Sequence, residues 1–410
     1  MSARFGDDGT FAPVDWRRPH ASTLPVSGAW RPSDPTGDRQ FMRTAVDRDF
    51  VLEGGGQLRD ITVAFETWGT LDEDRSNAVL VCHALTGDSH AAGPAGPGHH
   101  DDGWWDAVIG PGKAIDTDRW FVVCPNVLGG CQGTTGPASH HPNHPGRYGS
   151  SFPVVTIRDM VRVEARLADA LGIERWASVL GGSMGGMQVL EWGVMFPHRV
   201  ASLVPIATCL AATAQQIAYW STGRRAIALD PKWRNGDYYD AEPGDGPHAG
   251  LALARMFSQI TFRTDDVFTS RFGRDSVEPL AGDFEMWQRF QVERYLEHHG
   301  DKLIHRFDAN SYLLLTKAMD LHDLSRGRGG TATALGRLTA PTLSIGVSSD
   351  VLYPSYQQRE LASRLREHGV DARYAEIDSP HGHDAFLLEH EQVGQLVREF
   401  LDDRKVTDAR

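Results

Sequence analysis

The segment RWASVLGGSMGGMQVLEW, residues 175–192, joins an apolar run, four glycines packed around Ser183, and a second apolar segment. Glycine weakens helices by roughly 0.5 to 1 kcal/mol per interior position relative to alanine, so its use here needs a reason other than stability. Glycines are required where side chains would collide with neighbouring backbone at a sharp strand-to-helix turn. The segment therefore predicts a strand, a turn that exposes the Ser183 hydroxyl, and a helix. The alternative is a glycine-rich turn whose serine only caps the helix.

Strand and helix patterns alternate along most of the chain. From residue 120 onward, helical segments separate the apolar runs, and the segment 156–173 carries a one-face apolar stripe that ends at Gly172. This alternation predicts an α/β fold with a mostly parallel central sheet and helices on both faces. The expected strands are short β-branched or aromatic runs at 50–52, 61–67, 78–82, 120–125, 176–180, 201–208, 341–347 and 373–377.

Composition and periodicity divide the chain into an N-terminal arm, a core and an insertion. Residues 1–45 are rich in Pro, Arg, Asp and Gly without periodicity, which predicts an irregular N-terminal arm. Residues 211–335 read as helix after helix between two core strands, which predicts a helical lid inserted into the core. The core itself is expected at 46–210 and 336–405.

Composition excludes several classes of function. The chain has 54 acidic and 41 basic residues, a net charge of -13, and no basic block that fits nucleic acid. No apolar run reaches the roughly 18 to 20 residues that span a bilayer, and the N-terminus lacks a signal-peptide pattern. Four cysteines at scattered spacings fit reduced thiols without a metal role. We expect a cytoplasmic protein that binds neither nucleic acid nor membrane.

A serine at such a turn becomes a nucleophile only when a base takes its proton and an acid orients the base. In this arrangement the acid and then the histidine follow the serine along the chain. Asp350 lies just past the strand PTLSIGV, and the later loop SPHGHDAFL contains His381 and His383. We select His383, because a glycine frees the backbone before it and an apolar helix start follows it. Singly, Asp350 could be a turn former and His383 a solvated loop residue; together they predict the triad Ser183, Asp350 and His383.

Acyl transfer also needs donors for the oxyanion. The backbone amide of Met184, directly after the predicted nucleophile, is one expected donor. The loop after the strand NAVLVC usually gives the second, and we assign it to the amide of Leu85.

Long strings of this sequence resemble the homoserine O-acetyltransferases of the α/β-hydrolase superfamily. They are AFETWGTL, HALTGDSHAAG, PGKAIDTDRWFVVCPNVLGGCQGTTGP, GGSMGGMQ, GLALARMFSQITF and GHDAFL, and the resemblance covers about residues 45–402. It implies an α/β-hydrolase fold and transfer of acetyl from acetyl-CoA to the hydroxyl of L-homoserine, on the route to methionine. It also implies a homodimer whose helical lids pack together.

The resemblance also implies an acceptor site. Arg255 matches the arginine that holds the homoserine carboxylate, and Asp384 matches the residue that meets the ammonium group, pairings that suit both charges. Without the resemblance, a lid-surface salt bridge and a helix N-cap would explain these two residues. The chain departs from the family at Phe262, where a tyrosine is usual, which removes one hydroxyl from the acceptor pocket.

Histidine-rich loops at 99–102 and 140–144 raise the question of a metal. Loops rich in Pro and Gly offer no shared rigid face for ligands, so we predict no metal. We also predict no resident cofactor, since acetyl-CoA is a co-substrate.

Three alternatives remain open from the sequence. The same triad could serve a hydrolase that uses water as acceptor, or the chain could be an idle scaffold that only binds partners. The donor could be succinyl-CoA and the acceptor serine. The sequence does not show how wide the tunnel that admits the acyl donor is.

Overall fold

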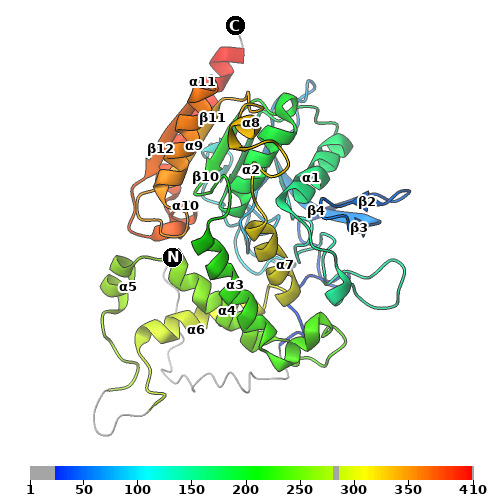
Figure 1. The fold of residues 1–410 in the computed structure, drawn as a ribbon, viewed down its shortest axis with the longest axis vertical. Helices are drawn as coiled ribbons and strands as arrows, with labels where there is room; N and C mark the ends of the chain where they lie inside the picture. Colours follow the sequence, from blue (N-terminus) through cyan, green and yellow to red (C-terminus); the bar gives the residue numbers. More distant parts are fainter. Residues whose placement is uncertain (1–23, 280–285, 409–410) are drawn as a thin grey trace.

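The computed structural model describes residues 24–279 and 286–408 (Figure 1). Its centre is an eight-stranded sheet in the order β1-β4-β8-β5-β9-β10-β11-β12. The strands are β1 (Gln40–Thr44), β4 (Ile61–Trp68), β8 (Phe121–Pro125), β5 (Ala78–Cys82), β9 (Ser178–Gly182), β10 (Leu203–Ile206), β11 (Thr342–Val347) and β12 (Ala372–Ile377). Two small pairs lie outside it, β2 (Phe50–Val51) with β3 (Gln57–Leu58) and β6 (Ile109–Gly110) with β7 (Ile115–Asp116).

The sheet is mostly parallel, as the sequence predicts. The pairs from β8 through β12 are parallel, and only β1 with β4 and β4 with β8 are antiparallel. Parallel strands end at the same edge of a sheet, so the segments after β5, β9, β11 and β12 emerge side by side. Ligands of open α/β sheets bind at this edge.

Both faces of the sheet are covered. Along β5, Leu80 belongs to one apolar cluster while Val79 and Val81 belong to another, because successive side chains of a strand point to opposite faces. The first cluster includes apolar side chains of α1 (Ile157–Leu171), α2 (Met184–Met195) and α9 (Ser355–Glu367). The second includes those of α11 (His390–Asp408). Strands buried on both faces read as continuous apolar runs, which is the pattern in the sequence.

Helix α1 shows how local signals fix an element. Thr156 and Asp159 form a capping box at its start, and Gly172 ends it with a φ of 69°. The predicted end at Gly172 is confirmed. The short helix α10 (Ala385–Leu388) completes the core. Helix α8 (Thr331–Leu335) falls at the end of the predicted lid segment 211–335 but packs against α9 of the core.

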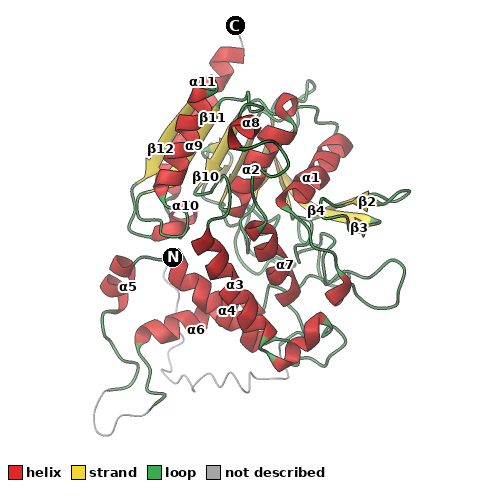
Figure 2. Ribbon diagram, viewed as in Figure 1, coloured by secondary structure: helices red, strands yellow, loops and turns green. Residues whose placement is uncertain are grey.

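In the described part of the lid, five helices lie together below the sheet in Figures 1 and 2. They are α3 (Ala214–Ala228), α4 (His248–Phe262), α5 (Asp265–Phe272), α6 (Gln291–Ile304) and α7 (Ala309–Asp320). The N-terminal arm differs from its prediction: residues 1–23 lie outside the described residues, but residues 40–44 form β1 rather than an irregular segment. Their side chains are half-buried or exposed, so no apolar alternation marked this edge strand.

No helix among the described residues is both long and apolar enough to cross a membrane. The four cysteines are all buried, and none is in a disulfide.

A buried glutamate lies between α1 and α2. Glu164 on α1 is 2% exposed and accepts a hydrogen bond of 2.7 Å from the indole N–H of Trp192 on α2. Its other carboxyl oxygen has no hydrogen-bond partner within the described chain. Burial raises the pKa of Glu164 to about 7, although the Trp192 hydrogen bond opposes the rise. The side chain is therefore neutral at mildly acidic pH.

We expect Glu164→Gln to remove a pH dependence of stability. Between the unfolded pKa near 4.5 and the folded pKa near 7, the unfolded chain releases a proton that the folded chain keeps, so raising the pH destabilises the fold. The glutamine keeps an acceptor for Trp192 and cannot ionise. Denaturant unfolding is expected to show the variant roughly 2 to 3 kcal/mol more stable than the wild type at pH 8 and nearly equal at pH 5. A difference that is the same at both pH values contradicts the assignment.

Candidate active site

Ser183 lies at the turn between β9 and α2 in a strained conformation. Its φ of 59° and ψ of -121° are rare for a residue with a side chain and cost about 1 to 3 kcal/mol. The neighbours must be glycines: a Cβ at Gly185 would lie 2.1 Å from the carbonyl oxygen of Cys82, and one at Gly182 would lie 2.4 Å from the Phe386 ring. Ser183 makes no side-chain capping bond to α2, so the capping explanation is wrong.

The structure joins Asp350 to His383 rather than to His381. Asp350 follows β11, and its Oδ2 accepts a hydrogen bond of 2.7 Å from Nδ1 of His383. Its Oδ1 accepts two backbone hydrogen bonds, from the amides of Leu352 at 2.8 Å and Tyr353 at 2.9 Å. Because the carboxylate is fixed by the loop after its own strand, it holds the imidazole with Nε2 free for proton transfer.

Aromatic packing brings the histidine loop onto the serine turn. The ring of Phe386 is centred 5.5 Å from the His383 ring and also fills the space left by Gly182, the residue before Ser183. Ser183 is 5% exposed and His383 is 3% exposed. No direct hydrogen bond joins these two side chains within the described chain, which is common for catalytic pairs before substrate binds.

The two expected oxyanion donors are both available. Neither the Leu85 amide nor the Met184 amide donates a hydrogen bond within the described chain. The loop of Leu85 lies against the serine turn, because the side-chain amide of Gln188 on α2 donates to the carbonyl of His83 at 3.4 Å. Unpaired amides at such a place can donate hydrogen bonds to the oxyanion of a tetrahedral intermediate.

Arg255 on α4 presents a free cation beside the site. Its guanidinium lies 5.3 Å from the centre of the Phe262 ring and forms no hydrogen bond or ion pair with any described residue. The alternative of a lid salt bridge is therefore wrong. Burial lowers the pKa of Arg255, while the nearby carboxylate of Asp384 acts in the opposite direction. Burial and the charge of Arg255 also lower the pKa of His299 to about 3, so this neighbour adds no positive charge.

Asp384 stands at the start of α10 but makes no capping bond with its side chain, so the capping alternative is also wrong here. Its Oδ2 instead pairs with Nη2 of Arg263 at 3.2 Å. Arg263, which follows Phe262 at the end of α4, was not among the residues predicted from the sequence. Its position next to Phe262 was the only signal available in the sequence. Nothing in the sequence places the end of a lid helix against the histidine loop.

One group of described residues could offer three metal ligands: Glu66, His90 and His99, whose ligand atoms lie within 4.8 Å of one another. The two imidazoles, however, are stacked with centroids 3.7 Å apart and planes 11° apart. Nitrogen lone pairs lie in the ring plane, so those of two parallel rings cannot converge on one ion as a tetrahedral site requires. Nε2 of His99 also accepts a hydrogen bond of 3.2 Å from the Asp38 amide. The absence of a metal stays a prediction.

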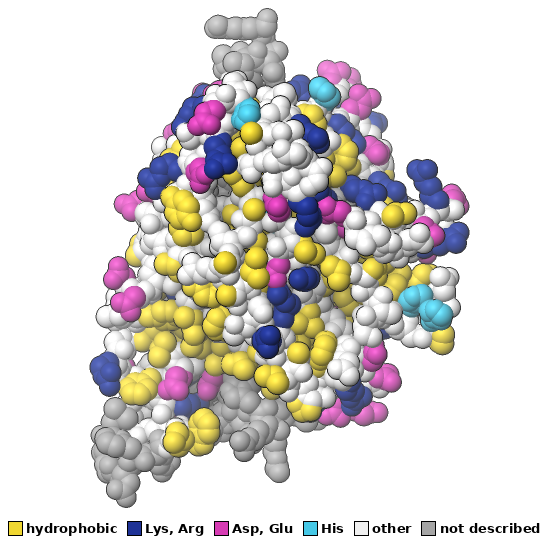
Figure 3. Space-filling model, viewed as in Figure 1, with side chains coloured by type: hydrophobic (Ala, Val, Ile, Leu, Met, Phe, Trp, Pro, Cys, Tyr) yellow, Lys and Arg dark blue, Asp and Glu magenta, His cyan; other side chains and the backbone are white. Residues whose placement is uncertain are grey.

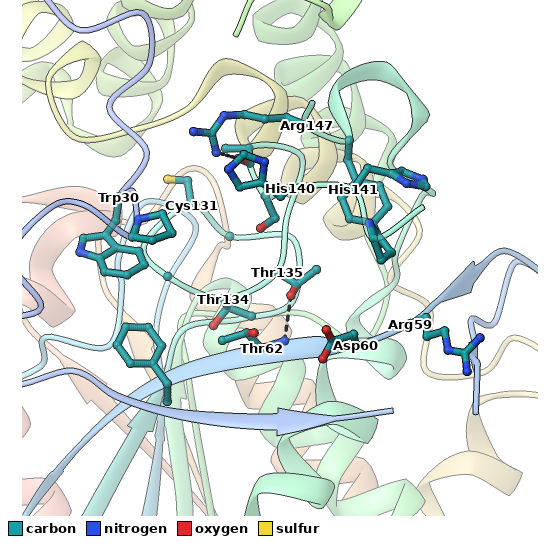
Figure 4. A pocket seen from close by; sticks show the side chains of 18 residues that line it. Trp30, Arg59, Asp60, Thr62, Cys131, Thr134, Thr135, His140, His141 and Arg147 are labelled. Atoms are coloured by element: carbon teal, nitrogen blue, oxygen red, sulfur yellow. Dashed lines mark hydrogen bonds between the residues drawn. The ribbon is translucent and has the colours of Figure 1, made fainter. Parts of the chain in front are cut away.

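A separate pocket of about 420 Å³ lies on the loop after β8 (Figure 4). Trp30, His140 and Arg147 line it, and on its floor Thr135 Oγ1 accepts a hydrogen bond of 2.9 Å from the amide of Thr62. None of Ser183, Asp350 and His383 lines this pocket, so it is not the place of the predicted chemistry.

Comparison with known proteins agrees with this architecture. A family model described as the alpha/beta hydrolase fold matches residues 77–390. A homoserine O-acetyltransferase of Thermobifida fusca (strain YX) is 54% identical over 382 residues, which cover 92% of this chain and 97% of the relative. The crystal structure of a homoserine O-acetyltransferase from Bacillus anthracis matches with a TM-score of 0.81 at 30% identity, covering 88% of this chain and 97% of that one.

A crystal structure of an esterase is similar to the same degree, with a TM-score of 0.80 at 29% identity, covering 88% of this chain and 99% of that one. The fold and its serine turn thus define an α/β hydrolase with an inserted helical lid. Identity to the relative of Thermobifida fusca far exceeds identity to the esterase. The chain belongs to the homoserine O-acetyltransferase family.

We expect Asp350→Asn to lower turnover by roughly 10⁴, because His383 would lose the acceptor that fixes its tautomer. His381→Ala is the matched control and is expected to keep most of the activity, since Asp350 pairs with His383 alone of the two. Steady-state release of CoA from acetyl-CoA measures both variants. Loss of activity in the His381 variant with an active Asp350 variant reverses the choice between the two histidines.

Proposed function

We propose that this chain transfers an acetyl group from acetyl-CoA to the hydroxyl of L-homoserine through an acyl-enzyme on Ser183. The observation that carries the proposal is the charge layout beside the predicted triad. Arg255 has no partner within the described chain, and Asp384 directly follows His383. A free guanidinium suits the carboxylate of an amino acid, and a carboxylate suits its ammonium group.

The proposed reaction has two displacements. In the first, His383 Nε2 takes the proton of Ser183, Oγ attacks the thioester carbon, and the carbon–sulfur bond breaks as CoA leaves with the proton from His383. In the second, the homoserine hydroxyl gives its proton to His383 and attacks the serine ester. The bond to Oγ breaks, and His383 returns the proton to Ser183. The amides of Leu85 and Met184 hold the oxyanion in both steps.

Hydrolysis is the second candidate, and the similarity to an esterase structure favours it. Water at about 55 M hydrolyses an open serine ester unless the site excludes it and holds the acceptor in line. Arg255 and Asp384 supply the means of holding an amino acid. They therefore favour transfer over hydrolysis. The identity of the substrates is tested by a CoA-release assay that combines acetyl- or succinyl-CoA with homoserine or serine.

No resident metal or cofactor has a role in this scheme, because acetyl-CoA enters and leaves as a co-substrate. We also place the enzyme in the cytoplasm. That placement is supported by its supply of CoA esters, by the four unbridged cysteines and by the excess of acidic residues.

We expect Arg255→Ala and Asp384→Ala to raise the apparent KM for homoserine and to divert acyl-enzyme to water. The first displacement involves no acceptor, so the burst of CoA release is expected to change little. Measuring burst, acetylhomoserine and free acetate in parallel separates the steps. A slower burst with an unchanged ratio of acetylhomoserine to acetate shows that these residues do not form the acceptor site.

Phe262→Tyr is the matched variant for the acceptor pocket. Because Phe262 packs against both Arg255 and His383, a hydroxyl there points into the same space. The variant is expected to keep turnover, because it leaves the charges of Arg255 and Asp384 in place.

We also propose a homodimer through the lid. Hydrophobic side chains gather over α3, α4 and α6 in Figure 3. Leu253 is 53% exposed and Ile260 49% exposed, and their spacing puts both on one side of α4. On the neighbouring α3, Ile217 is 37% exposed. Contiguous apolar surface of this kind on a monomer commonly marks an interface.

The double variant Leu253→Asp with Ile260→Asp is expected to turn a dimer into a monomer, because a dry interface cannot bury two unpaired carboxylates. Light scattering at micromolar concentration measures the mass. Val154→Asp, at an exposed apolar residue of the core, is the control and keeps the wild-type mass. A monomeric wild type overturns the proposal.

A further inference from the structure

A carboxylate on a core strand reaches the loop that carries the expected oxyanion donor. Glu66 lies on β4 and is 1% exposed. Its Oε1 accepts a hydrogen bond of 2.8 Å from the hydroxyl of Ser89, and its Oε2 accepts one of 2.8 Å from Nδ1 of His90. Both partners belong to the loop after β5, three residues or fewer beyond the turn closed by Gly87.

Other anchors hold the same loop at its start and middle. The amide of Val127 donates to Nε2 of His83 at 3.0 Å, which leaves Nδ1 to donate to the carbonyl of Ala84 at 2.7 Å. From the lid side, Nη1 of Arg306 donates to the carbonyl of Thr86 at 2.7 Å. Leu85 therefore lies between fixed points, and Glu66 supplies the fixed point beyond it.

The pKa values of the two stacked histidines, His90 and His99, shift in opposite directions. Burial by itself lowers the pKa of His90, but the hydrogen bond and charge of Glu66 outweigh it, and the pKa is raised. The stacked ring of His99 behaves oppositely, because burial lowers its pKa and Arg39 adds to that effect.

A buried pair of this kind is a poor source of stability. Taking a charged group out of water costs about as much as its buried partners return, and apolar replacements are often as stable or more so. Such a pair does fix geometry, because both carboxylate oxygens must meet their donors. An oxyanion amide depends on that geometry: a misplacement of about 1 Å can cost roughly 10²-fold in rate.

We propose that Glu66 is a positioning residue for the oxyanion hole, acting on the Leu85 amide through Ser89 and His90. The inference rests on the proposed role of Leu85 but not on the identity of the donor or acceptor. It is therefore tested with p-nitrophenyl acetate, a simple ester that acylates Ser183 without CoA or homoserine. If the release of p-nitrophenol is unchanged by Ser183→Ala, the serine chemistry itself is wrong.

The test compares Glu66→Gln with Glu164→Gln, a change of another buried glutamate whose hydrogen bond goes to Trp192 and not to the loop. The rate constant of the burst is expected to fall about 10- to 100-fold in the Glu66 variant and less than about twofold in the Glu164 variant. Burst amplitude, which counts folded active sites, is expected to stay near one per chain in both. Affinity for phenylboronic acid, which forms a tetrahedral adduct on serine, is expected to fall in parallel with the rate constant.

An unchanged rate constant in a folded Glu66→Gln variant overturns the proposal. So does a loss confined to burst amplitude, because that shows only a structural role. If Glu66→Gln does not fold, Ser89→Ala decides, since it removes a single hydrogen bond at little cost in volume. This variant is expected to lower the rate constant about 3- to 10-fold with full amplitude, and no change there overturns the proposal.

Discussion

The close packing of backbone at the serine turn is the constraint on which the site depends. Gly185 brings the first turn of α2 against the carbonyl of Cys82 at the end of β5, where no side chain fits. This contact sets the serine turn beside the loop of Leu85 and so places nucleophile and oxyanion donors together. The strain at Ser183 is held because strands on both sides over-determine the turn.

The lid contributes to the site as much as the core does. The residues at the end of α4 bind the histidine loop directly. The hydroxyl of Thr264 donates to the carbonyl of Pro380 at 2.6 Å, and Arg263 pairs with Asp384. A Cβ at Gly382 would lie 2.8 Å from the carbonyl oxygen of Phe262. The helix that carries Arg255 is thereby tied to the loop that carries His383. The same contacts therefore fix the positions of Arg255 and of His383.

The charged side chains around the site differ in whether they have partners. Asp384 pairs with Arg263 at 3.2 Å, whereas Arg255 has no hydrogen-bond or ion-pair partner within the described chain. A half-buried cation without a partner is costly, which agrees with the proposed role of Arg255 in binding a carboxylate. The same logic does not apply to Glu66, whose oxygens are already occupied by Ser89 and His90.

The sequence by itself determined the strands of the parallel core, the helix ending at Gly172, and the order of Ser183, Asp350 and His383. These follow from local rules: residue period, capping and the glycines of a tight turn. The choice of His383 over His381 also came from its immediate neighbours, and the hydrogen bond to Asp350 involves that histidine.

Only the tertiary structure decided which distant side chains meet. Strand β1 forms because an existing edge, β4, offers hydrogen bonds to a segment without apolar alternation. The partner of Asp384 is Arg263 and the partners of Glu66 are Ser89 and His90, pairings with no local signal. Each depends on where a side chain lands after the sheet is assembled, and periodicity and capping carry no information about that.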